Sequence, residues 1–178
     1  RAYHDKNKWA DILDGTHRTC KALKAHGAQH LVLIDSISER RAPTAGRVDE
    51  AIEMDKEEWK SYRERLETSA RIGVEEYGLT VGIHAHAAGF MDFEPELERL
   101  LSEVDEKILK ICFDTGHHSY AGFDPVKFMQ KYISRISYMH FKDINPNIKQ
   151  NVIENRTGFY DACGQGVFCN LGDGDVNF

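Results

Sequence analysis

Lys110-Ile-Cys-Phe-Asp-Thr-Gly-His117 is the stretch that decides the fold. The apolar run that begins at Ile108 breaks abruptly here into Asp114, Gly116 and His117. A buried parallel strand is written as such a run, and α/β proteins keep their chemistry on the loops at the carboxyl ends of their strands. Asp114 suits a strand interior poorly, so its place at the exit indicates a ligand or a catalytic group. The alternative is a helix N-cap followed by solvated histidines, and this segment alone leaves both open.

Three further strand-like runs, 31–34, 79–86 and 136–143, end in the same way. The side chains at their exits that can bind or react are Asp35, His84, His86, His140, Lys142 and Asp143. A spacing of two residues places His84 and His86 on one face of a strand, and it does the same for His140 and Lys142. Five of the nine histidines lie at or just beyond three strand ends, which a random distribution would not produce.

The composition is that of a soluble globular protein, because 41% of the 178 residues are hydrophobic and 29% are charged. A net charge of −6 and the lack of a basic stripe argue against a nucleic-acid partner. No apolar run reaches the roughly 18 residues of a membrane span, and no signal peptide is visible. The four cysteines show no CxxC spacing, and the patterns place Cys20 on a helix face and Cys112 in a strand. Free thiols and a cytoplasmic location are therefore expected.

Helical periodicity alternates with the strand-like runs. It predicts helices over about 5–26, 55–77, 95–104 and 124–133. The segment 36–54 is long for a loop and carries Arg40, Arg41 and Arg47, which either meet a substrate or are solvated. Residues 144–178 read as irregular and glycine-rich.

The alternation of helices and strands predicts an α/β fold with a parallel sheet and right-handed crossovers. No glycine-rich phosphate loop follows a strand, which disfavours a nucleotide-binding doubly wound sheet. A (β/α)8 TIM barrel fits better, because it places chemistry at every strand exit. A full barrel needs about 250 residues. We therefore expect residues 1–178 to be a single domain, an incomplete barrel of about four central βα units of eight, truncated at both ends.

Four motifs occur together in order: His84-Ala-His86-Ala-Ala-Gly89-Phe90, Phe113-Asp114-Thr-Gly-His117, His140-Phe-Lys142-Asp143, and Gly166-Val-Phe168 with Gly172-Asp173-Gly174. In this combination the chain resembles the xylose-isomerase-like TIM-barrel superfamily of sugar phosphate isomerases and epimerases. Within it, the glycine-rich ending is most similar to the inosose (2-keto-myo-inositol) dehydratases. The likeness runs from about residue 31 to residue 178. Ala85 departs from the run of three histidines that those dehydratases carry at this point.

The resemblance implies a divalent metal, Mn, Co, Mg or Zn, at the carboxyl end of the barrel. Asp114 and His140 are the ligands it implies. His84 stands where the isomerases carry a glutamate, and is either a third ligand or has passed that role elsewhere. The fourth ligand of the superfamily, a glutamate on the last strand, would lie beyond Phe178.

Lys142, His86 and His117 are the candidate catalytic residues. Lys142 would protonate a departing hydroxyl or hold a carbonyl oxygen, while the two histidines would contact substrate hydroxyls or transfer protons. Asp143 is expected to orient Lys142 or a histidine beside the substrate. Asp173 is either a substrate-binding group or a turn residue. The remaining histidines are expected to be structural or solvated: His4, His17, His26, His30 and His118.

The function this implies is a metal-dependent lyase that dehydrates a keto-inositol through an enediolate. The alternative is a sugar or sugar-phosphate isomerase or epimerase that uses the same metal and intermediate, and a non-catalytic half-barrel is a third option. The expected partner is a small sugar or inositol-derived ketose, with neither nucleic acid nor membrane. Unpaired sheet edges would make the chain poorly soluble or drive homo-oligomers.

Overall fold

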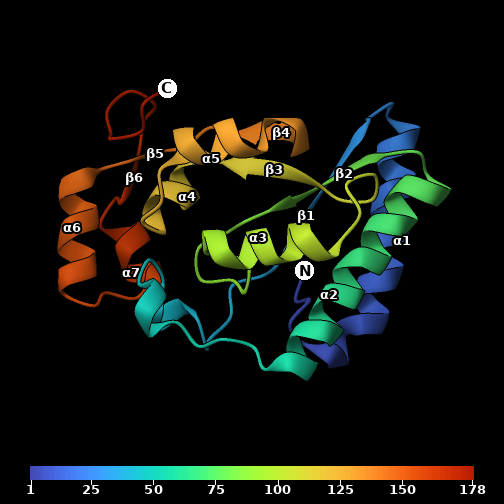
Figure 1. The fold of residues 1–178 in the computed structure, drawn as a ribbon, viewed down its shortest axis with the longest axis horizontal. Coiled ribbons are helices and arrows are strands. Elements are labelled where there is room, and N and C mark those ends of the chain that lie inside the picture. Colours follow the sequence, from blue (N-terminus) through green and yellow to red (C-terminus); the bar gives the residue numbers. More distant parts are fainter.

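A four-stranded parallel sheet forms the centre of the computed structural model, which describes all of residues 1–178 (Figure 1). Its strands are β1 (His30–Ile34), β2 (Thr80–His84), β3 (Lys110–Asp114) and β4 (Ile136–His140), and they pair in chain order. A doubly wound sheet reverses its strand order at a switch point, whereas a barrel keeps consecutive strands as neighbours. The order seen here confirms the predicted barrel-type sheet.

Helix α1 (Trp9–Ala25) precedes β1, and the strands are connected through α2 (Lys56–Arg71), α3 (Glu94–Glu103) and α5 (Pro125–Tyr132). All four predicted helices are therefore present, although the first begins at Trp9, after a 3₁₀ turn η1 (Lys6–Lys8). Asp55 opens α2 with the capping box that its sequence predicts, and a π-helical turn η4 (Ile72–Glu76) extends that helix. In Figure 1, α1 and α2 lie side by side at one end of the sheet.

The core lies between these helices and one face of the sheet. Alternate strand residues are buried against buried leucines of α2 and α3, as the period of two along a strand requires. The buried strand residues on this face include Leu31, Leu33, Val81, Ile83, Ile111 and Phe113. The packing of apolar side chains across this layer is the main source of stability for the fold.

The opposite face of the sheet is concave. His30 of β1 and Tyr138 of β4 stand on the two edge strands, yet their ring centroids are only 5.5 Å apart. Gly82 lies between the edges, and a Cβ there would come within 2.9 Å of the backbone nitrogen of Cys112. Such curvature over four strands is that of a sector of a barrel.

Residues 144–178 contradict the prediction of irregular structure. They contain α6 (Pro146–Glu154) and α7 (Phe159–Gly164), and the pair β5 (Asp143–Ile144) and β6 (Phe168–Cys169) is antiparallel. Both helices are short and α6 buries only Val152, so the apolar periodicity was too weak to predict them. Asn145, which caps α6 ahead of Pro146, was the local signal that went unused.

The long segment 36–54 is partly packed against the protein and partly exposed. It forms two 3₁₀ turns, η2 (Ala42–Thr44) and η3 (Val48–Glu50). A further 3₁₀ turn, η5 (Ile133–Arg135), follows α5. Arg41 and Arg47 are buried and bonded to protein groups, so neither alternative expected for these two holds. Arg40 is half-exposed and is solvated, as one of the alternatives expects. Cys20 and Cys112 are buried free thiols, as expected. None of the helices has both the length and the apolar character that a membrane span requires.

Candidate active site

Asp114 performs two tasks at the end of β3. Its Oδ1 accepts a hydrogen bond of 2.8 Å from the backbone N–H of His117, which caps the short helix α4 (Thr115–Tyr120). Its Oδ2 faces the other way, toward His84 and His140. The two alternatives left open by the sequence, cap and ligand position, are therefore not exclusive, because each uses a different carboxylate oxygen.

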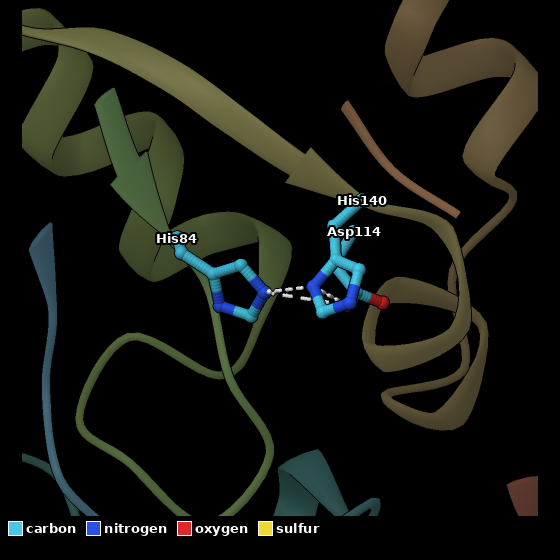
Figure 2. Close-up of side chains that lie close together, drawn as sticks. All are labelled: His84, Asp114 and His140. Carbon is cyan, nitrogen blue, oxygen red and sulfur yellow. Dashed lines mark hydrogen bonds and ion pairs between the residues drawn. The ribbon is translucent and has the colours of Figure 1, made fainter. Parts of the chain in front are cut away.

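Two imidazole nitrogens converge on Oδ2 of Asp114, which makes a group of three ligand-type atoms (Figure 2). His84 Nε2 lies 3.2 Å from that oxygen, and His140 Nδ1 lies 2.9 Å from it. The two imidazole nitrogens are 3.1 Å apart. The register of the sheet produces this cluster, because Asp114 pairs with His140 and His84 ends the neighbouring strand β2.

The donor set fits a divalent cation. Ligand atoms bound at about 2.0–2.2 Å to one ion, at roughly right angles to one another, lie about 3 Å apart, and the three separations seen here match that value. Two imidazoles and a carboxylate suit Zn²⁺, Mn²⁺ or Co²⁺. His84 and Asp114 are buried while the His140 side chain is 52% exposed, so the cluster opens to the outside on the β4 side.

The electrostatics of the cluster keep Asp114 ionised. Burial opposes its ionisation, but the hydrogen bond with His84, the N–H of His117 and the charge of Lys142 outweigh burial and hold the pKa of the carboxyl well below its usual range. Partial burial lowers the pKa of His140, against the opposing effect of Asp114. Metal ligands must be deprotonated, so both shifts favour binding of a cation.

A second group of bases adjoins the first. Lys142 Nζ lies 2.9 Å from His117 Nε2 and 3.5 Å from Asp114 Oδ2. The rings of His117 and His86 have centroids only 3.9 Å apart. The structure thus brings together all six of the residues proposed from sequence as ligands or catalytic groups: His84, His86, Asp114, His117, His140 and Lys142.

A backbone contact assigns the tautomer of His86. Nδ1 of His86 lies 2.7 Å from the carbonyl of Ala87, so this nitrogen carries the proton and Nε2 offers a lone pair. His117 lies between two donors, because the N–H of Ala87 is 3.3 Å from its Nδ1 and the Lys142 ammonium is 2.9 Å from its Nε2. A neutral imidazole accepts on only one nitrogen, so these two contacts are alternatives set by the tautomer of His117.

Both rings are neutral at pH 7. Burial lowers the pKa of His86 to about 4. Burial and the neighbouring His86 lower the pKa of His117 well below its usual value. Neutral imidazoles can accept a proton as well as donate one, which general acid–base chemistry requires.

Asp143 has a different surrounding from the one expected. Its buried carboxylate contacts neither Lys142 nor a histidine and instead accepts hydrogen bonds from four backbone N–H groups. The donors are those of Ile144, Gly172, Gly174 and Val176. A Cβ on Gly174 would overlap Asp143 and the carbonyl of Ile144. Asp143 therefore folds the glycine-rich ending onto β5.

Asp173 is not brought to the cluster. It is exposed, and its one side-chain partner is the amide of Asn170 at 3.2 Å. Of the two roles that the sequence left open, the geometry matches that of a turn residue.

Three residues in contact with Lys142 were given no role from sequence. Thr115 Oγ1 donates to the carbonyl of Lys142 at 2.7 Å and accepts from its N–H at 3.0 Å. A Cβ at Gly116 would lie 2.7 Å from Cβ and Cγ of Lys142, so glycine is required for this approach. Phe168 places its ring 4.8 Å from the Lys142 ammonium. The Thr-Gly pair inside the Asp114–His117 motif was the available signal.

Histidines expected to be structural include one that is deeply buried. The ring centroid of His118 lies 4.7 Å from that of Phe128 and 5.2 Å from that of Phe113. Burial lowers the pKa of His118 to about 4. His4 lies 3.0 Å from the buried carboxylate of Asp35 at the exit of β1.

Comparisons with known proteins agree with this fold. A family described as "Xylose isomerase-like TIM barrel" matches residues 2–178. An inosose dehydratase of Geobacillus kaustophilus is 32% identical over 139 residues, which are 78% of this chain and 44% of that protein. The chain thus spans about half the length of the curated relatives it matches.

Solved structures show the same fold. The probable 3-DHS dehydratase AsbF of Bacillus anthracis superposes with a TM-score of 0.68 at 20% identity, over 93% of this chain and 56% of that one. The IOLI protein, solved with a bound zinc atom, superposes with a TM-score of 0.62 at 15% identity, over 87% of this chain and 59% of that one.

Proposed function

This chain belongs to the xylose isomerase-like TIM-barrel family, and on that premise we propose that it carries the metal and acid–base groups of a dehydratase that acts on a cyclic keto-inositol. The observation that carries the proposal is the convergence of His84, Asp114 and His140 within reach of the Lys142–His117 pair. Relatives named inosose dehydratase, with about 30% identity, support the substrate class.

The cation would be held by His84 Nε2, Asp114 Oδ2 and His140 Nδ1. When bound, a divalent cation supplies a Lewis acid that stabilises the negative charge that develops on a ketone oxygen. One structural neighbour was solved with a zinc atom, and another was solved in complex with magnesium. We propose a divalent ion of this kind for the present chain and leave its identity to measurement.

The chain's own residues provide the proton transfers. Dehydration removes a proton from the carbon beside the carbonyl, breaks the bond from the next carbon to its hydroxyl oxygen, and releases that hydroxyl with a proton as water. His86 offers the lone pair of Nε2 as the base, since its Nδ1 is held by Ala87. Lys142 delivers the proton to the departing hydroxyl. His117, 2.9 Å from Lys142, exchanges a proton with it between turnovers.

The same groups would serve an isomerase or epimerase, because that reaction begins with the same proton abstraction and differs only in where the proton returns. The experiment is therefore to incubate the full chain with keto-inositol and a divalent cation, and to follow the ultraviolet absorbance of the conjugated diketone. The His140→Ala variant is the control, since it removes a half-exposed ligand and leaves the core intact. We expect absorbance to rise with the wild type only.

Two other results would contradict the proposed dehydratase activity. Exchange of substrate hydrogen with solvent in the absence of diketone would establish the isomerase or epimerase instead. Neither diketone nor exchange, in a protein that still binds the cation, would favour a binding module.

A further inference from the structure

The loop between β2 and α3 (residues 85–93) folds into a buried turn that carries His86 and Ala87 into the site. His86 N–H donates to the carbonyl of Met91 at 2.8 Å, and Gly89 N–H donates to that of His86 at 3.1 Å. Ala88, at the corner, has a φ of +67°. Residues with a Cβ rarely adopt this left-handed conformation, so surrounding groups must hold it in place.

Asp92 is the side chain that holds this corner. Its Oδ2 accepts from the backbone N–H of Ala88 at 2.9 Å, and the carboxyl is almost wholly buried. On the other side, Ser38 N–H donates to the carbonyl of Ala88 at 2.9 Å. Both polar backbone groups of the strained residue are thus fixed, one of them by a side chain alone.

A largely buried ion pair supports Asp92 from outside the site. Glu96 Oε2 accepts from the backbone N–H groups of Asp92 and Phe93, both at 3.0 Å. Its Oε1 accepts from Arg41 Nη1 at 2.7 Å. The Arg41 side chain is 1% exposed and also donates to the carbonyl of Ile52 at 2.9 Å. The fully buried arginine therefore fixes the position of Glu96, which in turn bonds the backbone of Asp92.

The peptide unit before this corner fixes the proton of His86. The carbonyl of Ala87 accepts from Nδ1 of His86 at 2.7 Å. The same peptide unit carries the N–H of Ala88 that donates to Asp92, so a rotation of this unit would break both contacts together. Asp92 is therefore coupled, through one peptide unit, to the tautomer of His86 and to the lone pair that its Nε2 offers.

We propose that Asp92 is a positioning residue of this site, which holds Ala88 in its left-handed conformation so that the carbonyl of Ala87 fixes the proton of His86 on Nδ1 and leaves Nε2 free as the base. For the activity readout this rests on the proposed dehydratase. The tautomer readout does not. Burial raises the pKa of Asp92 to about 7, so its isosteric amide is a close substitute that keeps the accepting oxygen.

The test uses the full chain with ¹⁵N-labelled histidine and reads the tautomer of His86 from its ring nitrogen shifts. Three variants are compared: Asp92→Ala, which removes the acceptor; Asp92→Asn, which retains it; and Asp124→Ala. Asp124 is the matched control, since it also holds backbone N–H groups, those of Val126 and Lys127, but caps α5 away from the site.

We expect His86 in Asp92→Ala to lose its single Nδ1–H tautomer, with kcat falling roughly tenfold to a hundredfold while KM and metal content stay close to the wild type. Asp92→Asn should restore the wild-type spectrum, and Asp124→Ala should lower stability without changing that spectrum. A single Nδ1–H tautomer in folded Asp92→Ala would overturn the proposal, as would a wild-type kcat in an active enzyme. If the wild type forms no diketone, the proposed function fails while the spectrum still decides the role of Asp92.

Should Asp92→Ala not fold, the same spectrum is recorded for Asp92→Ala combined with Ala88→Gly. Glycine adopts a φ of +67° without a Cβ, so the turn loses its strain but also its fixed direction. Mixed tautomers are expected here too. A wild-type spectrum in this double variant would contradict the role assigned to Asp92.

Discussion

Nε2 of His117 and Nζ of Lys142 lie 2.9 Å apart, although one residue belongs to the helix after β3 and the other follows β4. The contact depends on the short link between the two segments, in which Thr115 bonds both backbone groups of Lys142. It joins an imidazole that is neutral at pH 7 to an amine beside the ligand-type oxygen of Asp114. Proton transfer and cation binding are thus adjacent but rest on different side chains, and they can be tested separately.

Lys142→Met should abolish dehydration and leave cation binding intact. Methionine keeps the aliphatic stem that packs on Gly116 but removes the amine, and loss of a general acid typically costs about 10²–10⁴ in rate. The turnover of keto-inositol and the metal content of the same preparation are the measurements. A Lys142→Met enzyme as fast as the wild type would remove Lys142 from the mechanism.

Gly116→Ala should displace Lys142. The added Cβ would lie 2.7 Å from two carbons of the lysine stem, and overpacking of this kind costs about 1–3 kcal/mol. We expect a lower free energy of unfolding in urea and a lower kcat, with the larger relative change in kcat. Gly164→Ala is the control, because nothing lies within 4 Å of a Cβ there. Equal behaviour of the two variants would show that the close approach has no role.

Asp143→Ala should destabilise the C-terminal segment. It leaves four backbone N–H groups without their acceptor, and a buried group without a partner costs about 1–3 kcal/mol. Asp173→Ala, which removes an equal charge from an exposed turn, should change the free energy of unfolding by less than about 0.5 kcal/mol. Urea denaturation compares them. A neutral Asp143→Ala would mean that this network contributes nothing to folding.

Acid should weaken the fold through His118. Burial holds its pKa at about 4 in the folded protein, against about 6.5 when unfolded, so the unfolded chain binds more protons between these values. The contribution of neutral His118 to the free energy of unfolding is fully present above pH 6.5. It is lost as the pH falls toward 4, and the loss is about 2 kcal/mol at pH 5.

His118→Phe removes this proton uptake and keeps an aromatic ring beside Phe113 and Phe128. The difference between variant and wild type at pH 7.5 measures the change in packing together with the loss of the contact between His118 Nε2 and Glu94 Oε2, which lie 3.2 Å apart. From pH 7.5 to pH 5, the variant should lose less stability than the wild type, as followed by urea denaturation at each pH. Parallel pH profiles would contradict the assignment.

Much of the fold followed from the sequence because its signals are local. Apolar runs predicted the four strands, and helical periodicity predicted α1, α2, α3 and α5. The residues at the exits of β2, β3 and β4 predicted the cluster, since parallel strands bring their carboxyl ends to one edge of a sheet. The helices α6 and α7 were missed because they are short and bury few residues. A sequence window contains no tertiary partner that would reveal them.

The parts of the site that were missed depend on contacts between distant segments. Asp143 was assigned to Lys142 from its position beside it, but its carboxylate turns toward residues 172–176, some thirty positions away. Asp92 lies in no recognisable motif. Its role depends on the left-handed conformation of Ala88, and alanine is not a residue type that predicts this conformation. From the sequence, Arg41 was expected to meet a substrate or to be solvated in a loop. Its pairing with Glu96 explains its burial.

The central claim is that His84, Asp114 and His140 form a cation site, and the metal content of the purified full chain tests it most directly. Asp114→Asn is the decisive variant, since its amide oxygen can still cap His117 while the charge beside the two histidines is lost. Asp173→Asn removes the same charge from the surface. We predict a near-stoichiometric divalent metal in the wild type and in Asp173→Asn, and none in Asp114→Asn. A metal content in Asp114→Asn equal to that of the wild type, or no bound metal in any of the three, would contradict the account.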